Sequence, residues 1–123
     1  MSETSHPFFD MHAHGFVRVA CATPCCRPAD VAYNTAGVLA EARKAHAAHV
    51  DLVVFPELTL SSYAIDDLLL QRALIERVEA ALAEVVAASA ELAPVLIVGA
   101  PLLRGDALYN CAVVIAGGRI LGV

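Results

Sequence analysis

Short apolar runs recur along the chain, and longer segments with helical spacing separate them. Residues 16–22 alternate weakly and carry β-branched side chains, which predicts a first strand. Residues 52–55 and 95–99 are apolar throughout and of strand length. Runs without alternation are typical of parallel strands between helices, because both faces of such a sheet are shielded from water.

Helical periodicity fills the two segments between these runs. Residues 30–50 are rich in alanine, with larger apolar and charged residues at helical spacing, and Asp30 is a suitable N-cap. Asp66 or Asp67 can open the second helical segment, and one apolar stripe continues through residues 74–85. Each strand is therefore expected to lead into the next through a helix.

The last part of the chain reads as a hairpin. Residues 109–116 and 119–123 are strand-like and flank a Gly-Gly pair, which suits a tight turn. The order β-α-β-α-β followed by a hairpin predicts an α/β fold, one sheet with helices packed on it. We expect residues 16–123 to form one domain, preceded by a flexible leader or subunit-contact arm at residues 1–15.

The composition is unusually apolar for a free-standing domain. Hydrophobic residues make up 59% of the chain and charged residues 17%, and the mean hydropathy is +0.65. No apolar stretch reaches the roughly 18 residues that a membrane-spanning helix needs. The chain also ends within a predicted strand. We therefore expect a fragment of a larger protein, whose other parts cover the open faces of this one.

Charge and cysteine content limit the classes of partner and the cellular compartment that we expect for this protein. A net charge of −5 and a pI near 5.4 argue against a nucleic-acid partner, since phosphate binding requires a basic surface. The N-terminus lacks the basic and apolar regions of a signal peptide, and the four cysteines lack the spacing of a disulfide framework. We expect a cytoplasmic protein with reduced thiols and no membrane partner.

A carboxylate stands directly after the second apolar run. Pro56 has no backbone N–H to donate, so it helps to end the strand, and Glu57 follows at once. Open α/β sheets bind ligands at the carboxyl ends of their strands. We therefore predict that Glu57 accepts protons at the rim of the sheet, partly shielded from water. From position alone, a solvated glutamate that caps a loop is the commoner case.

Four blocks of sequence, in this order, resemble the nitrilase, or carbon–nitrogen hydrolase, superfamily. They are HGFVRVACATP, VVFPELTLSSYAIDDLLLQ, APVLIVGAPL and LYNCAVVIAGGRILGV. Within the superfamily they are most similar to the N-terminal glutaminase domains of glutamine-dependent NAD synthetases. The resemblance implies a nitrilase-like α-β-β-α sandwich, of which this chain forms part, and a Glu–Lys–Cys catalytic triad.

The resemblance assigns roles to two residues of this chain. Glu57 matches the triad glutamate, the general base that activates the cysteine. The family's lysine follows shortly after a block like GRILGV and its cysteine comes later, so both are expected beyond Val123. Tyr63 matches an aromatic position that lines the glutamine pocket, and a packing tyrosine at a helix entrance is the alternative.

Two neighbouring positions bear on this site. The family usually has glycine where this chain has Ser62, and serine strains the loop if that backbone needs a positive φ. Asn110 matches the family's Tyr-Asn pair, and we interpret it as structural, an amide that ties a strand to a neighbouring loop.

The resemblance implies a parent enzyme that hydrolyses glutamine and passes ammonia to a C-terminal synthetase domain. That domain amidates nicotinic acid adenine dinucleotide, and ATP and Mg are expected there; no cofactor is expected in this chain, which has no Gly-rich phosphate loop. We expect a homo-oligomeric parent and an inactive fragment. The alternatives are another amidase, nitrilase or carbamoylase of the superfamily, and a catalytically silent interaction module.

Histidines and cysteines suggest two other sites, and their patterns argue against both. A zinc site is not expected, because the candidates lack CxxC or HExxH spacing; they are His12, His14, Cys21, Cys25 and Cys26. A nucleophile is not expected at Cys111, whose strand neighbours are apolar, because buried thiols are inert. Cys25 and Cys26 lie in a loop where no family motif places chemistry.

Overall fold

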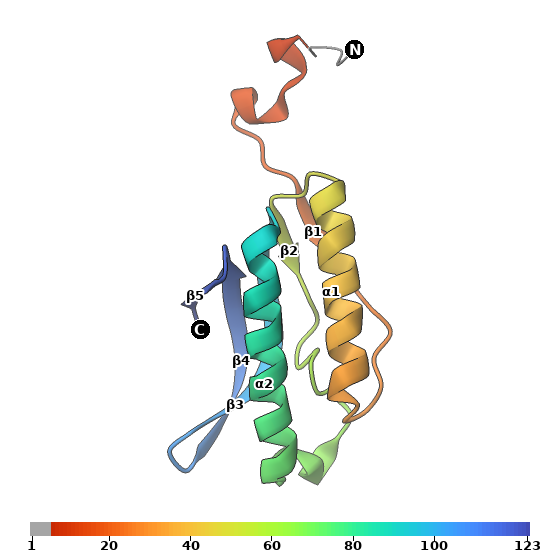
Figure 1. The fold of residues 1–123 in the computed structure, drawn as a ribbon, viewed down its shortest axis with the longest axis vertical. Helices are drawn as coiled ribbons and strands as arrows, with labels where there is room; N and C mark the ends of the chain where they lie inside the picture. Colours follow the sequence, from red (N-terminus) through yellow and green to blue (C-terminus); the bar gives the residue numbers. More distant parts are fainter. Residues whose placement is uncertain (1–5) are drawn as a thin grey trace.

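The structure is a computed structural model that describes residues 6–123 (Figure 1). The first five residues of the predicted leader lie outside this description. The helices and strands are β1 (Val19–Cys21), α1 (Val31–Ala47), β2 (Leu52–Val54), α2 (Arg72–Ala88), β3 (Val95–Arg104), β4 (Ala107–Ala116) and β5 (Arg119–Gly122). The 3₁₀ helices are η1 (Pro7–Phe9), η2 (Met11–His14), η3 (Asp66–Leu70) and η4 (Ser89–Glu91).

The strands form one five-stranded sheet in the order β1-β2-β3-β4-β5. β1, β2 and β3 are parallel, because α1 and α2 return the chain to the same end of the sheet each time. β3, β4 and β5 are antiparallel and follow one another through tight turns. The predicted α/β fold, with parallel early strands and a terminal hairpin, is confirmed.

Both long helices cover the same face of the sheet (Figure 1). Every second strand residue faces them, as the pleat requires, and these side chains are fully buried: Val53, Leu96, Val98, Ala100, Val113 and Ile115. The helices contribute Val38 and Ala42 of α1 and Val78 and Val85 of α2. In residues 6–123 the opposite face of the sheet has no such layer. The sequence predicts parallel strands that are shielded on both faces, whereas this part of the structure shields one face only.

The helix starts follow the prediction in one case and differ in the other. Asp30 caps α1, since its carboxylate accepts a hydrogen bond from the backbone N–H of Tyr33 at 3.1 Å. Asp66 and Asp67 begin the short η3 instead of the long helix, which starts at Arg72 without a side-chain cap. No helix within residues 6–123 is long and apolar enough to cross a membrane.

Two strands differ in length from the prediction. β1 covers only three residues, and Phe16 and Val17 before it are about two-thirds exposed. β3 continues past Gly99 to Arg104, and pairs with β4 from Leu96↔Ile115 to Arg104↔Ala107. This extension is not predicted from the sequence, because glycine and proline at 99 and 101 interrupt the apolar pattern.

Candidate functional site

Glu57 lies just beyond the carboxyl end of β2, where the sequence predicts it. The backbone N–H of Phe55 still donates to the carbonyl of Ile97 at 2.9 Å, and Pro56 then ends the pairing with β3. A shallow depression of about 270 Å³ adjoins Glu57 on the sheet. Its lining comes from three consecutive strands and the loop: Val54, Phe55, Pro56, Glu57, Ile97, Gly99, Asn110, Cys111 and Ala112.

The loop that carries Glu57 is tied to the body of the domain at several points. The backbone N–H of Leu60 donates to the carbonyl of Gly99 at 3.3 Å, and the Asn34 side chain donates to the carbonyl of Leu60 at 3.2 Å. The carbonyl of Ser61 accepts from the backbone N–H of Ala29 at 2.9 Å. Leu60 and Ser61 are themselves fully buried. These bonds hold the backbone on the carboxyl side of Glu57 in one conformation.

Gly99 permits this loop to lie directly on β3. A Cβ atom at this position would contact the carbonyl oxygen of Pro56 and would lie 2.5 Å from the nitrogen of Leu58 and 3.0 Å from the carbonyl carbon of Glu57. Atoms in a packed protein do not approach so closely, so only glycine leaves room for the loop. A glycine inside an apolar strand is the sequence signal that could have indicated this close approach.

Asn110 of β4 donates a hydrogen bond from its amide nitrogen to Oε1 of Glu57. The prediction that this amide ties a strand to a neighbouring loop is confirmed. The sequence does not indicate that its partner is the Glu57 carboxylate itself. The carboxylate is thus restrained at its tip as well as through its backbone.

The Glu57 side chain is exposed within residues 6–123, so the expectation of partial shielding from water is not met there. The physical reason is the open face of the sheet. The depression is lined by Val54, Ile97 and Gly99, which alternate with residues that face the helices, and therefore opens on the uncovered side.

Ser62 and Tyr63 lie at the end of the same loop. Ser62 has a φ of 72°, in the left-handed region, so the positive φ considered from the sequence is present at this serine. Tyr63 is 68% exposed and is not among the residues that line the depression at Glu57. The described chain brings Asn110 to Glu57 but does not bring Tyr63 into contact with the same hollow.

Of the three cysteines considered as a nucleophile, only Cys111 lies beside Glu57. Cys111 borders the depression, but it is partly buried and packs against the hydrophobic core. Cys25 and Cys26 are exposed in the loop between β1 and α1, and the Cys26 thiol contacts the carbonyl of Pro24 at 3.6 Å.

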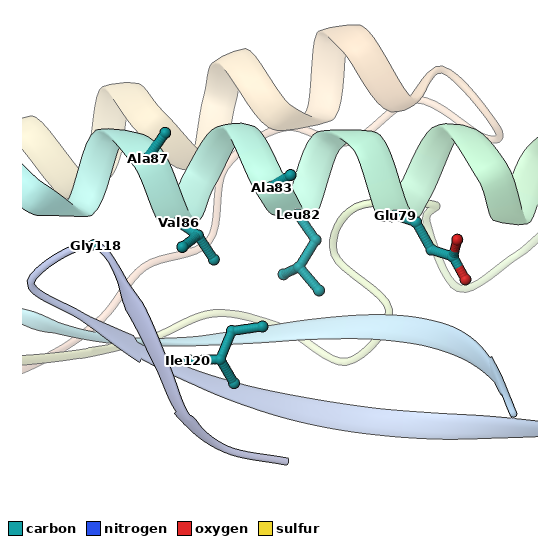
Figure 2. A pocket seen from close by; sticks show the side chains of 7 residues that line it. All are labelled: Glu79, Leu82, Ala83, Val86, Ala87, Gly118 and Ile120. Carbon is teal, nitrogen blue, oxygen red and sulfur yellow. The ribbon is translucent and has the colours of Figure 1, made fainter.

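A larger hollow of about 440 Å³ lies between α2 and β5 (Figure 2). Apolar side chains of both elements line it, including Leu82, Val86 and Ile120, and Glu79 is its one charged lining residue. Glu57 is not part of it. Its other lining residues are all apolar, so Glu79 has no second polar side chain in this hollow to work with.

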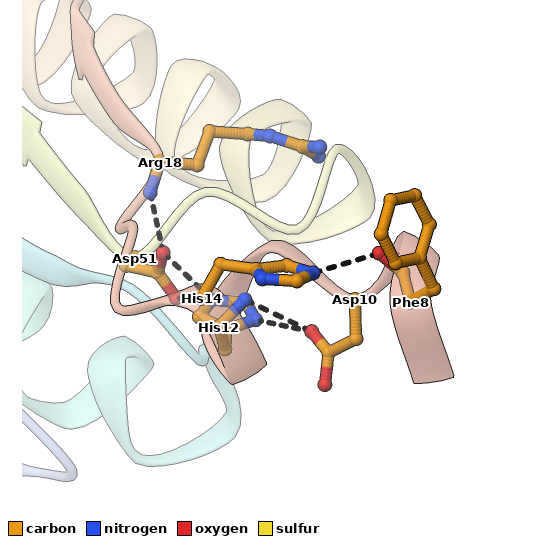
Figure 3. A network of polar contacts seen from close by, with 6 residues as sticks. All are labelled: Phe8, Asp10, His12, His14, Arg18 and Asp51. Atoms are coloured by element: carbon orange, nitrogen blue, oxygen red, sulfur yellow. Dashed lines mark hydrogen bonds and ion pairs between the residues drawn. The ribbon is translucent and has the colours of Figure 1, made fainter. Parts of the chain in front are cut away.

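The histidines of η2 form a polar network at the other end of β2 (Figure 3). Nε2 of His12 lies 3.0 Å from the Asp51 carboxylate and its Nδ1 lies 3.3 Å from that of Asp10. The hydrogen bond and charge of Asp51 raise the pKa of His12, with a smaller contribution from Asp10. The backbone N–H of Arg18 and the ring of His12 lower the pKa of Asp51. Within residues 6–123 no group of three or more His, Cys, Asp or Glu side chains is arranged so that it could hold a metal ion.

Comparison with known proteins identifies the family of this fold and site. Residues 18–123 match the family described as carbon-nitrogen hydrolase. The chain belongs to the carbon-nitrogen hydrolase family. Both Glu57 and Asn110 lie within the part of the chain that matches this family.

Individual members of the carbon-nitrogen hydrolase family resemble the chain to different degrees. It is 52% identical over 116 residues to the glutamine-dependent NAD(+) synthetase of Mycobacterium bovis. The matched region makes up 94% of this chain and 17% of that protein. The crystal structure of a glutamine-dependent NAD(+) synthetase from Cytophaga hutchinsonii matches with a TM-score of 0.80 at 24% identity, over 86% of this chain and 18% of that one.

An amidase of the same fold also matches. The structure of an amidase from Nesterenkonia sp. has a TM-score of 0.74 at 22% identity, over 86% of this chain and 41% of the amidase. These structural likenesses show that a glutamine-dependent NAD(+) synthetase and an amidase share this fold. The fold alone therefore does not determine the substrate of this member of the carbon-nitrogen hydrolase family.

Proposed function

We propose that the chain is the N-terminal part of the glutamine-hydrolysing domain of a glutamine-dependent NAD synthetase. The observation that carries this proposal is the 52% identity, over 94% of the chain, to the synthetase of Mycobacterium bovis. The chain spans only 17% of that relative, so the activity belongs to a longer protein. Glu57, on its rigid loop at the carboxyl end of β2, is the general base of the proposed site.

In the proposed reaction, Glu57 accepts a proton twice, once in each half of the reaction. In the first half, its carboxylate takes the proton of a cysteine thiol, and the thiolate attacks the side-chain amide carbon of glutamine. The C–N bond breaks, and ammonia leaves with that proton while a thioester remains. In the second half, Glu57 takes a proton from water, the hydroxide attacks the thioester, and glutamate leaves as the thiol is restored. The sum is glutamine plus water giving glutamate plus ammonia.

The cysteine and the lysine of this proposed triad come from the resemblance and are expected beyond Val123. The chain as printed therefore supplies one member of the triad, and we expect it to be inactive by itself. Ammonia would pass to a synthetase domain that holds ATP and Mg, and the complete protein would be a homo-oligomer in the cytoplasm.

The open face of the sheet supports a second layer in the complete protein. Partly exposed apolar side chains on that face, such as Val54, Ile97 and Val114, would be covered by the remainder of an α-β-β-α sandwich. Such a layer would also remove water from Glu57. Tyr63, whose ring is exposed at the end of the same loop, would then form one wall of a glutamine pocket.

The experiment that tests this proposal compares two glutamate variants of the complete protein. Glu57→Gln keeps the size of the side chain but cannot accept a proton, and is expected to lower the rate of ammonia release from glutamine by at least about a hundredfold. The matched control is Glu84→Gln on the exposed side of α2, which should retain the rate. A Glu57→Gln enzyme that keeps its glutaminase rate rules out the general-base role.

The same assay separates the proposed substrate from that of a general amidase. Glutamine should be hydrolysed far better than a short aliphatic amide such as propionamide, and ammonia from glutamine should support amidation of nicotinic acid adenine dinucleotide in the presence of ATP. Equal turnover of both amides without amidation would favour the amidase alternative. No amide turnover by the complete protein would favour an interaction module.

A further inference from the structure

Asn110 and Glu57 meet although they lie 53 positions apart in the chain. β4 places Asn110 opposite Pro101 of β3, two positions beyond Gly99. Alternate residues of a strand share a face, so Asn110 projects from the same face that the Glu57 loop crosses at Gly99. The contact therefore depends on the register of the β3–β4 hairpin.

The chemistry of the contact determines which atoms are engaged. An ionised carboxylate only accepts hydrogen bonds, and the amide nitrogen is the only donor of an asparagine side chain. Nδ2 of Asn110 donates to Oε1 of Glu57, which leaves Oε2 without that partner. The bond thus fixes one oxygen of the carboxylate and leaves the other able to accept a proton.

We propose that Asn110 is a positioning residue for Glu57. It holds Oε1 and thereby presents Oε2 to the thiol and to the water of the proposed reaction. This inference rests on the proposed function, because it gives Asn110 a role only if Glu57 transfers protons. Glu57 has several rotatable side-chain bonds, and an acceptor that must meet two successive proton donors gains rate from being held in one orientation.

A purely structural role for Asn110 is not required by the contacts. The loop around Glu57 is already bound through Phe55 to Ile97, through Leu60 to Gly99 and through Ser61 to Ala29. Within residues 6–123 Asn110 adds no backbone bond to this set, and its side-chain bond is made only to the carboxylate. Its removal should therefore disturb the carboxylate and leave the fold intact.

The test is a graded series in the complete protein, read out as kcat and KM for glutamine. Asn110→Ala removes the donor, so kcat should fall while KM changes little. Asn110→Asp also places a second acceptor against the first, which turns the Glu57 carboxylate away, so kcat should fall further. Ala107→Asp is the matched control, because it adds a carboxylate to the exposed start of β4, three positions away.

The expected size of the change in kcat follows from the bond that is lost. Asn110→Ala should lower kcat by about tenfold or more, the size expected for a lost hydrogen bond to a charged group, with little change in KM. Circular dichroism should show that each variant is folded. If Asn110→Asp does not fold, the constants of Asn110→Ala still decide the question.

The outcomes separate this inference from the proposed function. A kcat that falls in the order wild type, Asn110→Ala, Asn110→Asp, with Ala107→Asp at the wild-type value, supports positioning. Wild-type kcat for both Asn110 variants, in a protein that Glu57→Gln inactivates, overturns the inference and leaves the proposed function standing. A Glu57→Gln protein that retains its rate overturns the proposed function, and the inference with it.

Discussion

Gly99 of β3 and Pro56 of the loop after β2 lie so close that no side chain fits between them. The contact determines how close to the sheet the backbone of Glu57 lies where it crosses the open face. It also places the carbonyl of Gly99 within 3.3 Å of the backbone N–H of Leu60, which holds the far side of the loop. The position of the carboxylate therefore depends on the absence of a single methyl group from β3.

Substitution of Gly99 by alanine should displace the loop. The added Cβ would meet backbone atoms of Pro56 and Leu58, which have little freedom to move, so we expect a loss of about 1–3 kcal/mol in the free energy of unfolding. The measurement is urea denaturation of the complete protein, together with its glutaminase rate, which should fall because Glu57 moves.

Gly122→Ala is the control for this substitution. Nothing lies within 4 Å of a Cβ built on Gly122, and both changes restrict the unfolded chain equally. Gly122→Ala should therefore be neutral or slightly stabilising. Equal stability of the two variants would contradict the close approach at Gly99.

Replacement of Ser62 by glycine should relieve strain in the loop between Glu57 and Tyr63. Ser62 has a φ of 72°, which costs a residue with a Cβ about 1–2 kcal/mol. Glycine removes this cost but has more freedom to lose on folding, so the expected gain in the free energy of unfolding is about 0.5–1 kcal/mol. Thermal denaturation measures the gain.

Ala64→Gly provides the matched comparison two residues away. Ala64 is exposed and is not among the residues with positive φ, so glycine there only adds freedom to the unfolded chain. This variant should lose stability where Ser62→Gly gains it. A loss of stability in both variants would show that Ser62 is not strained.

Removal of the Tyr63 ring should weaken the binding of glutamine if this residue lines the pocket. Tyr63→Ala is expected to raise KM about tenfold, because it removes an apolar wall, while Tyr63→Phe should change KM less. Tyr33→Ala is the control. Tyr33 of α1 is also accessible, but its ring lies under the guanidinium of Arg27. An unchanged KM for Tyr63→Ala would favour the packing role.

The ion pair between His12 and Asp51 should join the N-terminal segment to the start of β2 over a limited pH range. The pKa of His12 is raised, so its contribution is complete below the ordinary value of 6.5 and is lost as pH rises through the raised value. The pKa of Asp51 is lowered, so its contribution is present above 3.8 and is lost as pH falls through the lowered value. The pair is thus strongest between these limits.

Histidine NMR titration of the complete protein measures this dependence. Asp51→Asn should lower the pKa of His12 more than Asp10→Asn does, because Asp51 makes the larger contribution. An equal effect of the two variants would contradict the geometry in which Asp51 is the main partner.

Features of the fold with a local cause could be predicted from the residues around them. Asp30 caps α1 through a hydrogen bond three residues ahead, and the two glycines before β5 form the expected turn. Pro56 ends the β2 pairing, so the place of Glu57 at the carboxyl end followed from two adjacent residues. Each of these depends on the chain within a few positions.

The sequence by itself determined the α/β class, the order of helices and strands along the chain, and the location of a carboxylate at the end of one strand. Hydrophobic spacing, caps and proline determine these features because they act over short distances. Only the tertiary structure decided that Asn110 donates to Glu57 and that Gly99 makes room for the loop. Both contacts require the pairing register of β3 with β4 and the crossing of β3 by a loop from β2. A glycine inside an apolar strand indicates a close approach, but no local pattern identifies the distant partner, because the contact forms only when distant segments pack together.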